Sequence, residues 1–214
     1  AARRYAFYES FAGARSFGGL DLAGAVDLNA FLLGKPNDMG GFDLVPVFWM
    51  PTDNVAKRVR EDHVPYDRWI ADGWIFPMHG AVRDDDQVVD VIEWLCAPAD
   101  MQEIAVDPWQ SPNIAGKLLQ RGVEVVKVAQ SFGQLAGPSE ELEKMLAAGT
   151  LRHDGNAVMS WMVGNAVADV DAAGNRKPSK QDSNERIDGM AALVTLLARA
   201  MVAAPPKKRT SQIF

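Results

Sequence analysis

The 214-residue sequence predicts an α/β fold in which a mixed sheet carries helices on both faces. Two features support this prediction: three β-rich runs follow one another between Phe17 and Met50, and helices alternate with strands after Pro51. A chain of this length buries roughly 70% of its unfolded surface in one core. We therefore expect a single compact domain.

The three β-rich runs read SFGGLDLA, VDLNAFLLG and FDLVPVFWM. A short turn at Gly24 separates the first two runs, and the cluster GKPNDMGG separates the last two. Because short connections join antiparallel neighbours, these runs predict an antiparallel three-strand meander.

The rest of the chain is predicted to contain β/α units. Candidate helices lie near residues 54–62, 85–97, 112–121, 139–148 and 184–203, with short strands at 103–107 and 123–128. Ser111 and Pro112 supply a cap and a first-turn residue for the third helix, which we expect to end at Gly122.

The C-terminal region is predicted to form a hairpin followed by a helix. The segment from Asp171 to Asn175 is typical of a hairpin turn. We expect the helix to begin at Asp182 or Ser183, with Glu185 in a capping box. Its buried stripe follows helical spacing and consists of Ile187, Met190, Ala191, Val194, Leu197, Ala198 and Met201.

Composition excludes several classes of protein. The net charge is −6, so any contact with nucleic acid must come from a local basic patch. The single Cys96 excludes a disulfide framework and a CxxC zinc site. Residues 190–204, the longest apolar stretch, are too few for the roughly 20 residues of a membrane span. The N-terminus lacks the apolar core of a signal peptide, so we expect an intracellular protein that is not secreted.

Three acidic residues lie where a solvated surface does not explain them. Asp21 interrupts an apolar strand, Asp107 ends a strand just before Pro108, and Asp188 lies at the edge of the apolar stripe of the last helix. Open α/β sheets bind ligands at the carboxyl ends of their strands. Taken singly, each residue also fits a structural role, as a turn or cap residue or as a complement to a helix dipole.

Carboxylates that converge require cations. Two of them 4 Å apart repel by about 4 kcal/mol at an effective dielectric constant of 20. Open carboxylate sites suit Mg²⁺ or Mn²⁺ rather than zinc. Two such ions about 4 Å apart activate water and stabilise the leaving oxygen in phosphodiester hydrolysis. If the three acids meet, the sequence predicts a two-metal centre.

Three segments resemble the nuclease domain of the large terminase subunit of tailed bacteriophages. They are GLDLAGAVDLNAFLL, IAVDPWQ and the long segment from WMVGN to LLARA. The most specific part is ERIDG at the start of an apolar helix, preceded by a hairpin and the stretch KPSK. The resemblance covers roughly residues 17–201. It implies an RNase H-like, RuvC-type fold and a metal-dependent endonuclease that cuts concatemeric viral DNA.

The resemblance also implies roles for individual residues. Asp21, Asp107 and Asp188 correspond to catalytic residues that bind two Mg²⁺ or Mn²⁺ ions. Asp27 matches a further acid of the family, which either helps to hold a metal or orders the turn. The implied partners are double-stranded DNA, the terminase ATPase domain, the small terminase subunit and the portal protein, in the cytoplasm of an infected bacterium.

The domain organisation differs from that of a complete large terminase. The sequence has no GxxxxGK[ST] phosphate loop, so we expect it to lack the ATPase motor. Residues 1–203 are expected to form a single nuclease domain. Residues 204–214 contain the stretch PPKKRTSQIF, which begins with two prolines, and are expected to form a flexible basic tail.

Basic residues near the last helix are the predicted DNA contacts. The segment NRKPSK carries three positive charges and no acid just before Asp188. We expect Lys177, Lys180 and Arg186 to lie near phosphates, in contacts that depend on salt and not on base sequence. The alternative is a solvated loop in which Arg186 pairs with a nearby acid.

Other interpretations stay open from the sequence alone. Trp109 either stacks on a base or packs against the following helix, and we favour packing. The chain could be another RNase H-like nuclease, such as a junction resolvase. It could also be a non-catalytic module that docks on the portal or the motor.

Overall fold

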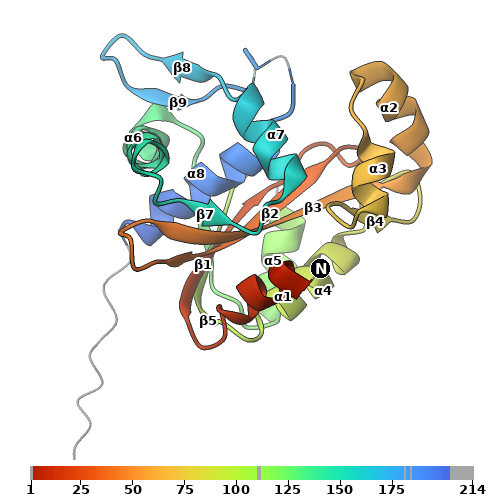
Figure 1. The fold of residues 1–214 in the computed structure, drawn as a ribbon, viewed down its shortest axis with the longest axis horizontal. Helices are drawn as coiled ribbons and strands as arrows, with labels where there is room; N and C mark the ends of the chain where they lie inside the picture. The colour runs from red at the N-terminus through yellow and green to blue at the C-terminus, as the bar shows by residue number, and fades with distance from the viewer. Residues whose placement is uncertain (1, 110–111, 181, 184, 203–214) are drawn as a thin grey trace, which may run out of the picture.

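A seven-stranded mixed sheet lies at the centre of the computed structural model (Figure 1), which describes residues 2–109, 112–180, 182–183 and 185–202. The strands of this sheet are β1 (Arg15–Asp21), β2 (Asn29–Pro36), β3 (Phe42–Pro51), β4 (Phe76–Met78), β5 (Asp100–Val106), β6 (Val125–Lys127) and β7 (Arg152–His153). Their order is β4-β3-β2-β1-β5-β6, and β7 also pairs with β3. The strands β8 (Ala168–Val170) and β9 (Arg176–Pro178) form a separate hairpin.

Helices cover both faces of the sheet, as predicted. The helices are α1 (Ala2–Glu9), α2 (Val55–Asp62), α3 (Tyr66–Ala71), α4 (Asp85–Cys96), α5 (Pro112–Gln120), α6 (Phe132–Ala148), α7 (Ala157–Asn165) and α8 (Asp188–Ala200). Side chains of α6, α7 and α8 belong to one hydrophobic core, and those of α4 and α5 belong to a second core on the opposite face. None of the helices in the described part of the chain is long and apolar enough to cross a membrane.

The predicted meander is confirmed. β1 pairs antiparallel with β2, and β2 pairs antiparallel with β3, whereas β5 joins β1 in parallel and β6 joins β5 in parallel. The central strands are buried on both faces. Neighbouring residues of a strand point to opposite faces, so they enter different cores. In β2, for example, Leu32 enters the core of α8 and Leu33 enters the core of α4.

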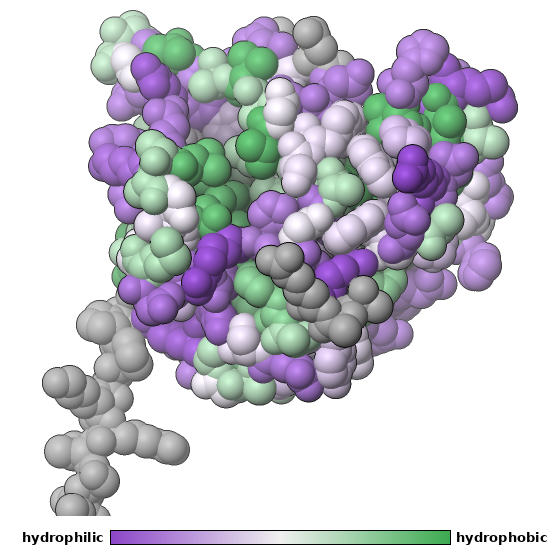
Figure 2. Space-filling view, in the orientation of Figure 1, coloured by the Kyte–Doolittle hydropathy of each residue, from purple (hydrophilic) through white to green (hydrophobic). Residues whose placement is uncertain are grey.

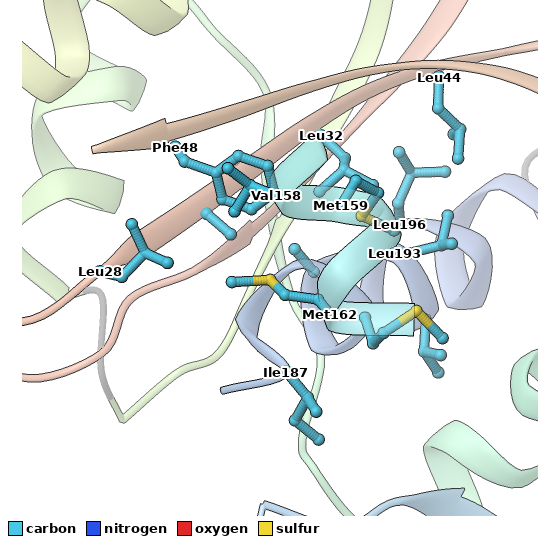
Figure 3. Packing of buried hydrophobic residues seen from close by; sticks show 14 of the residues in the cluster. Leu28, Leu32, Leu44, Phe48, Val158, Met159, Met162, Ile187, Leu193 and Leu196 are labelled. Atoms are coloured by element: carbon cyan, nitrogen blue, oxygen red, sulfur yellow. The ribbon is translucent and has the colours of Figure 1, made fainter. Parts of the chain in front are cut away.

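Helix α8 lies within the core, and its residues 188–197 are all buried. It is in close contact with β1, where a Cβ atom at Gly19 would lie 2.1 Å from the carbonyl oxygen of Ala192. Helix α7 covers α8 and the sheet together: Figure 3 shows Val158 beside Phe48 of β3 and Met159 beside Leu196 of α8, within one core. The contacts of α8 with both neighbours fix the position of its first residue relative to β1.

Two predicted helix starts are wrong. The last helix begins at Asp188 and not at Asp182 or Ser183, because the hydroxyl of Ser183 donates to the carbonyl of Ser179 at 2.6 Å and does not cap a helix. The capping box with Glu185 is not formed, since Ile187 occupies the N-cap position without a side-chain hydrogen bond.

Helix α6 begins at Phe132, earlier than the predicted residue 139, and contains Pro138 in its interior. The helix predicted at 184–203 ends at Ala200, and Met201 of the predicted buried stripe is exposed. The elements α1, α3, α7, β4 and β7 were not predicted. The predicted cap Ser111 and the tail 204–214 lie outside the described residues.

The predicted turn at 171–175 joins β8 to β9, and the hairpin stands away from the main sheet (Figure 1). Asp171 holds the turn, since its Oδ1 accepts the backbone N–H groups of Ala173 and Asn175 at 2.9 Å. A groove of about 230 Å³ lies between the hairpin, α6 and α7. Figure 2 shows hydrophobic residues gathered in a hollow on this side of an otherwise largely hydrophilic face.

Candidate active site

The carboxyl ends of two neighbouring strands bring Asp21 and Asp107 together. β1 and β5 are parallel with Leu20 opposite Val106, so Asp21 ends β1 and Asp107 directly follows the end of β5. Both aspartates are buried. Leu20 and Val106 face the core of α4, so the alternation of side chains turns the two aspartates toward the face of α8.

Asp188 reaches the same place from the helix that packs on β1. It is the first residue of α8 and is buried. Its carboxylate lies at the helix N-terminus, where unpaired N–H groups favour negative charge. Asp188 and Asp107 lie close enough for their charges to act on Asp21. The structure therefore brings the three predicted acids together at the carboxyl ends of β1 and β5.

Lys180 holds its ammonium group between two of these acids. Its Nζ lies 2.6 Å from Oδ2 of Asp21 and 3.6 Å from Oδ1 of Asp188. The lysine follows β9, so the hairpin positions it, and its side chain is 41% exposed. Oδ2 of Asp21 is buried, and the Lys180 ammonium is its close charged partner. The ion pair with Lys180 is therefore the main interaction that stabilises the negative charge of Asp21.

The pKa shifts follow from burial and from these charges. Burial raises the pKa of Asp21 to about 7, and Lys180 opposes this rise while Asp188 and Asp107 add to it. Burial likewise raises the pKa of Asp188, against Lys180 and Arg186. Burial alone would lower the pKa of Lys180, but the two carboxylates outweigh it and raise that pKa. The site is thus a group of buried acids that is stabilised by positive charge.

The donor set fits Mg²⁺ or Mn²⁺. Carboxylate oxygens are the ligands that these ions prefer, and Oδ2 of Asp21 is a buried oxygen that already faces a cationic group. Within the described ranges, no three acidic, histidine or cysteine side chains are already arranged to hold one ion. Asp21 and Asp188 face the ammonium of Lys180 instead, and Oδ1 of Asp107 accepts the backbone N–H of Trp109 at 2.9 Å.

Asp27, the further candidate, lies in the loop after β1 and is held by two guanidinium groups. Nη2 of Arg186 lies 2.7 Å from Oδ1 of Asp27, and Arg58 pairs with the same oxygen. Asp62 lies 3.8 Å from Arg186 and 3.9 Å from Arg58, and it accepts a hydrogen bond from the Tyr66 hydroxyl at 3.1 Å. This network connects the N-terminal end of α8 to α2.

Arg83 fixes the loop that follows β1. Its Nη1 donates to the carbonyl of Ala23 at 3.1 Å and to Oδ1 of Asn29 at 3.0 Å, and its Nε donates to Asp85 at 2.8 Å. Its backbone N–H also donates to the carbonyl of Ala25 at 2.6 Å. Sequence reasoning missed Arg83 and the network around Asp27, because these contacts join distant segments and no local spacing marks them. They give residues 51–91 a role in supporting the site.

The three predicted DNA contacts lie in different surroundings. Lys180 is the nearest to the acids and the most exposed. Lys177 lies on β9, and its Nζ is 2.9 Å from Oδ2 of Asp169 on β8. Arg186 is mostly buried against Asp27, which is the pairing with an acid that the sequence left open.

Trp109 does not pack against the following helix. Its side chain is 86% exposed, so the packing prediction is wrong. The Asp107 carboxylate holds the backbone of Trp109 in a tight turn that directs the chain away from the core.

Comparison with known proteins gives matches over most of the chain. The family described as "Terminase large subunit, endonuclease domain" matches residues 8–203. The large terminase subunit of Enterobacteria phage HK97 is 31% identical over 186 residues, which are 86% of this chain and 37% of that protein. The protein YmfN of Escherichia coli K12 is 26% identical over 205 residues, which are 91% of this chain and 45% of that protein. The chain thus spans less than half the length of these curated relatives.

Solved structures share the fold. The crystal structure of the HK97 large terminase superposes with a TM-score of 0.80 at 29% identity, over 90% of this chain and 42% of that one. The large terminase nuclease of the thermophilic phage G20c, in a crystal structure with bound magnesium, gives a TM-score of 0.55 at 14% identity, over 86% and 80% of the two chains. The second likeness concerns the fold alone. Together they confirm the predicted RNase H-like fold class.

Proposed function

The chain belongs to the family of terminase large-subunit endonuclease domains, and we propose that it hydrolyses phosphodiester bonds of double-stranded viral DNA with two divalent cations. The observation that carries the proposal is the meeting of Asp21, Asp107 and Asp188 at one edge of the sheet, with an ammonium group between two of them. Carboxylates that are buried at the ends of strands and repel one another are not explained by a structural role.

The three aspartates would hold two Mg²⁺ or Mn²⁺ ions. When bound, the ions make water a stronger nucleophile and stabilise the leaving oxygen. The relative with bound magnesium supports the choice of metal. The protein contributes the arrangement: Asp21 and Asp107 stand at the ends of neighbouring strands, and Asp188 stands on a buried helix, so the backbone that carries the three carboxylates is rigid.

Asp27 acts on the site through its neighbours in this proposal. Its Oδ1 is already shared by Arg58 and Arg186, so its role is to hold Arg186 and thereby the start of α8. This agrees with the alternative that Asp27 orders the turn. If it also reaches a metal, it must first release at least one arginine.

DNA is proposed to lie over the exposed side of Lys180. This lysine would neutralise a phosphate next to the cut, and Lys177 and Arg186 would extend the positive surface if they exchange their acidic partners for phosphates. Such contacts carry no base specificity. Little sequence preference is therefore expected of the cutting reaction.

The biological setting follows from the family. We propose that the domain acts with an ATPase motor, a small terminase subunit and the portal protein, and that it cuts concatemeric DNA in the cytoplasm of the infected bacterium. Within this chain we assign residues 1–203 to the nuclease domain and 204–214 to a basic tail.

The test is cleavage of supercoiled plasmid at low salt in Mg²⁺, Mn²⁺, Ca²⁺ or EDTA. We expect cleavage in Mg²⁺ or Mn²⁺ that disappears in EDTA and in Asp107→Asn. The control is Asp53→Asn, which changes an exposed aspartate and should cut at the wild-type rate. Equal cleavage by Asp107→Asn would contradict the proposal.

Two further results separate the alternatives. A strong preference for four-way junctions over linear duplex would indicate a junction resolvase. Absence of both cleavage and Mn²⁺ binding by calorimetry would indicate a docking module, because an occupied metal site must stabilise the fold by mass action.

A further inference from the structure

The two sides of the acid cluster differ in how well their charges are paired. On the side of β2, Asp27, Asp62, Arg58 and Arg186 neutralise one another. On the side of β6, two large exposed side chains lie at the carboxyl ends of the strands without such partners among the described residues. These are Trp109, after β5, and Lys127, at the end of β6.

Trp109 has an exposure that packing does not explain. Its side chain is 86% exposed, although an indole gains more from burial than almost any other side chain. Its backbone is nevertheless held in place, because its N–H donates to Oδ1 of Asp107. Only Pro108 separates the two residues, so their Cα atoms are at most about 7 Å apart. That distance corresponds to about two nucleotides along a DNA strand.

Lys127 lies at the end of β6, the strand next to β5, which leads into the turn of this tryptophan. β6 is parallel to β5, with Lys127 opposite Val106, the residue just before Asp107. Lys127 is exposed and forms no ion pair with an acid among the residues that the structure describes. Most other basic side chains in these ranges pair with an acid, as Lys117 pairs with Asp86, and so have less charge to offer to a phosphate.

We propose that Trp109 and Lys127 form a DNA contact on the β6 side of the active site. The indole packs against bases or sugars within about two nucleotides of the cut, and the ammonium of Lys127 contacts a phosphate of the same duplex. Lys180 would hold the DNA from the side of the hairpin, so the substrate is gripped on both sides of the acids. The inference rests on the proposed nuclease function.

The test measures binding of a short fluorescein-labelled duplex by anisotropy in Ca²⁺, over a series of salt concentrations. We expect Trp109→Ala to weaken binding about tenfold and Trp109→Phe to retain most of the affinity, because any aromatic ring can stack. Lys127→Ala should reduce the slope of log K against log salt by about 0.9, the value for one phosphate contact on duplex DNA. DNA should also quench tryptophan emission less in Trp109→Phe than in the wild type.

Two control variants match the tested residues. Trp94→Ala removes an indole that is 63% exposed on α4 and stacks on Tyr8, and Lys144→Ala removes an exposed lysine on α6. Both should bind DNA as the wild type does. Thermal stabilisation by Mn²⁺ should be unchanged in all variants, which shows that the fold and the acid cluster are intact.

The outcomes separate this inference from the nuclease proposal. Wild-type affinity and salt slope in both Trp109→Ala and Lys127→Ala, in a protein that cuts DNA, would overturn the contact and leave the nuclease standing. Binding that depends on Trp109 in a protein that cuts in no metal would support the contact and remove the nuclease. A wild-type protein that does not bind duplex at any salt concentration would overturn both.

Discussion

The ammonium of Lys180 lies 2.6 Å from Oδ2 of Asp21 and 3.6 Å from Oδ1 of Asp188. The lysine reaches this position from the end of the β8–β9 hairpin and not from the sheet that carries Asp21. The positive charge that stabilises the metal-free acids therefore comes from a different element than the acids themselves. A metal ion held by Asp21 and Asp188 would compete with Lys180 for the same oxygens.

We predict that Lys180→Met binds Mn²⁺ more tightly, by about tenfold, because a like charge no longer opposes the ion. The same variant should cut DNA more slowly, since a phosphate contact is lost. Calorimetric titration with Mn²⁺ and a plasmid cleavage assay measure the two effects. Lys177→Met is the control, because this lysine pairs with Asp169 on the hairpin and should leave Mn²⁺ affinity unchanged. Weaker Mn²⁺ binding by Lys180→Met would refute the competition.

Asp27 gives a second prediction, which distinguishes a metal ligand from a positioning residue. In Asp27→Asn, Arg58 and Arg186 lose their shared carboxylate, and we expect the free energy of unfolding to fall by about 2 kcal/mol. Mn²⁺ affinity should fall much less than in Asp21→Asn. Urea unfolding and calorimetry on both variants provide the comparison. An equal loss of Mn²⁺ affinity in the two variants would identify Asp27 as a ligand.

The parts of the site that the sequence could predict are those that depend on local pattern. Asp21 and Asp107 end apolar strands, and the alternation of side chains together with a parallel neighbour is enough to place both at one edge. The meander was predictable for the same reason, since turn residues and strand alternation are local signals. Asp188 was recognised by its motif, while the start of its helix was predicted six or five residues too early.

The parts that could not be predicted depend on contacts between distant segments. Ser183 reads as a helix cap, yet its hydroxyl bonds to Ser179 in the structure. Pro138 reads as a helix start, yet it lies inside α6. Arg83 and the exposure of Trp109 have no local signature, because each is defined by what surrounds it in three dimensions.

His153 predicts a dependence of stability on pH. Burial lowers its pKa, which Asp154 only partly offsets, and its Nδ1 accepts the backbone N–H of Asn156 at 3.1 Å. Below the ordinary histidine pKa of about 6.5, the unfolded chain binds a proton that the folded protein does not. The contribution of His153 to the free energy of unfolding therefore falls as the pH drops below that value, by up to about 1.4 kcal/mol per pH unit, until the folded pKa is reached.

Replacement of this histidine should flatten the pH profile. Urea unfolding between about pH 7.5 and about pH 5.5 should show a smaller loss of stability for His153→Gln than for the wild type. His79→Gln, at an exposed histidine, should follow the wild-type profile. If His153→Gln and the wild type lose stability in parallel, the imidazole is protonated equally in the folded and unfolded states.

Gly19 links the fold to the chemistry and gives the last prediction. A Cβ atom at this position would lie 2.1 Å from a backbone carbonyl oxygen of α8, which cannot turn aside as a side chain could. Gly19→Ala must therefore push α8 away from β1, at a cost of about 3 kcal/mol in the free energy of unfolding. Because Asp188 is the first residue of α8 and Asp21 ends β1, the same displacement should separate two acids and weaken Mn²⁺ binding. Gly24→Ala is the matched control, since a Cβ atom there meets nothing within 4 Å, and equal stability of the two variants would show that α8 does not set the geometry of the site.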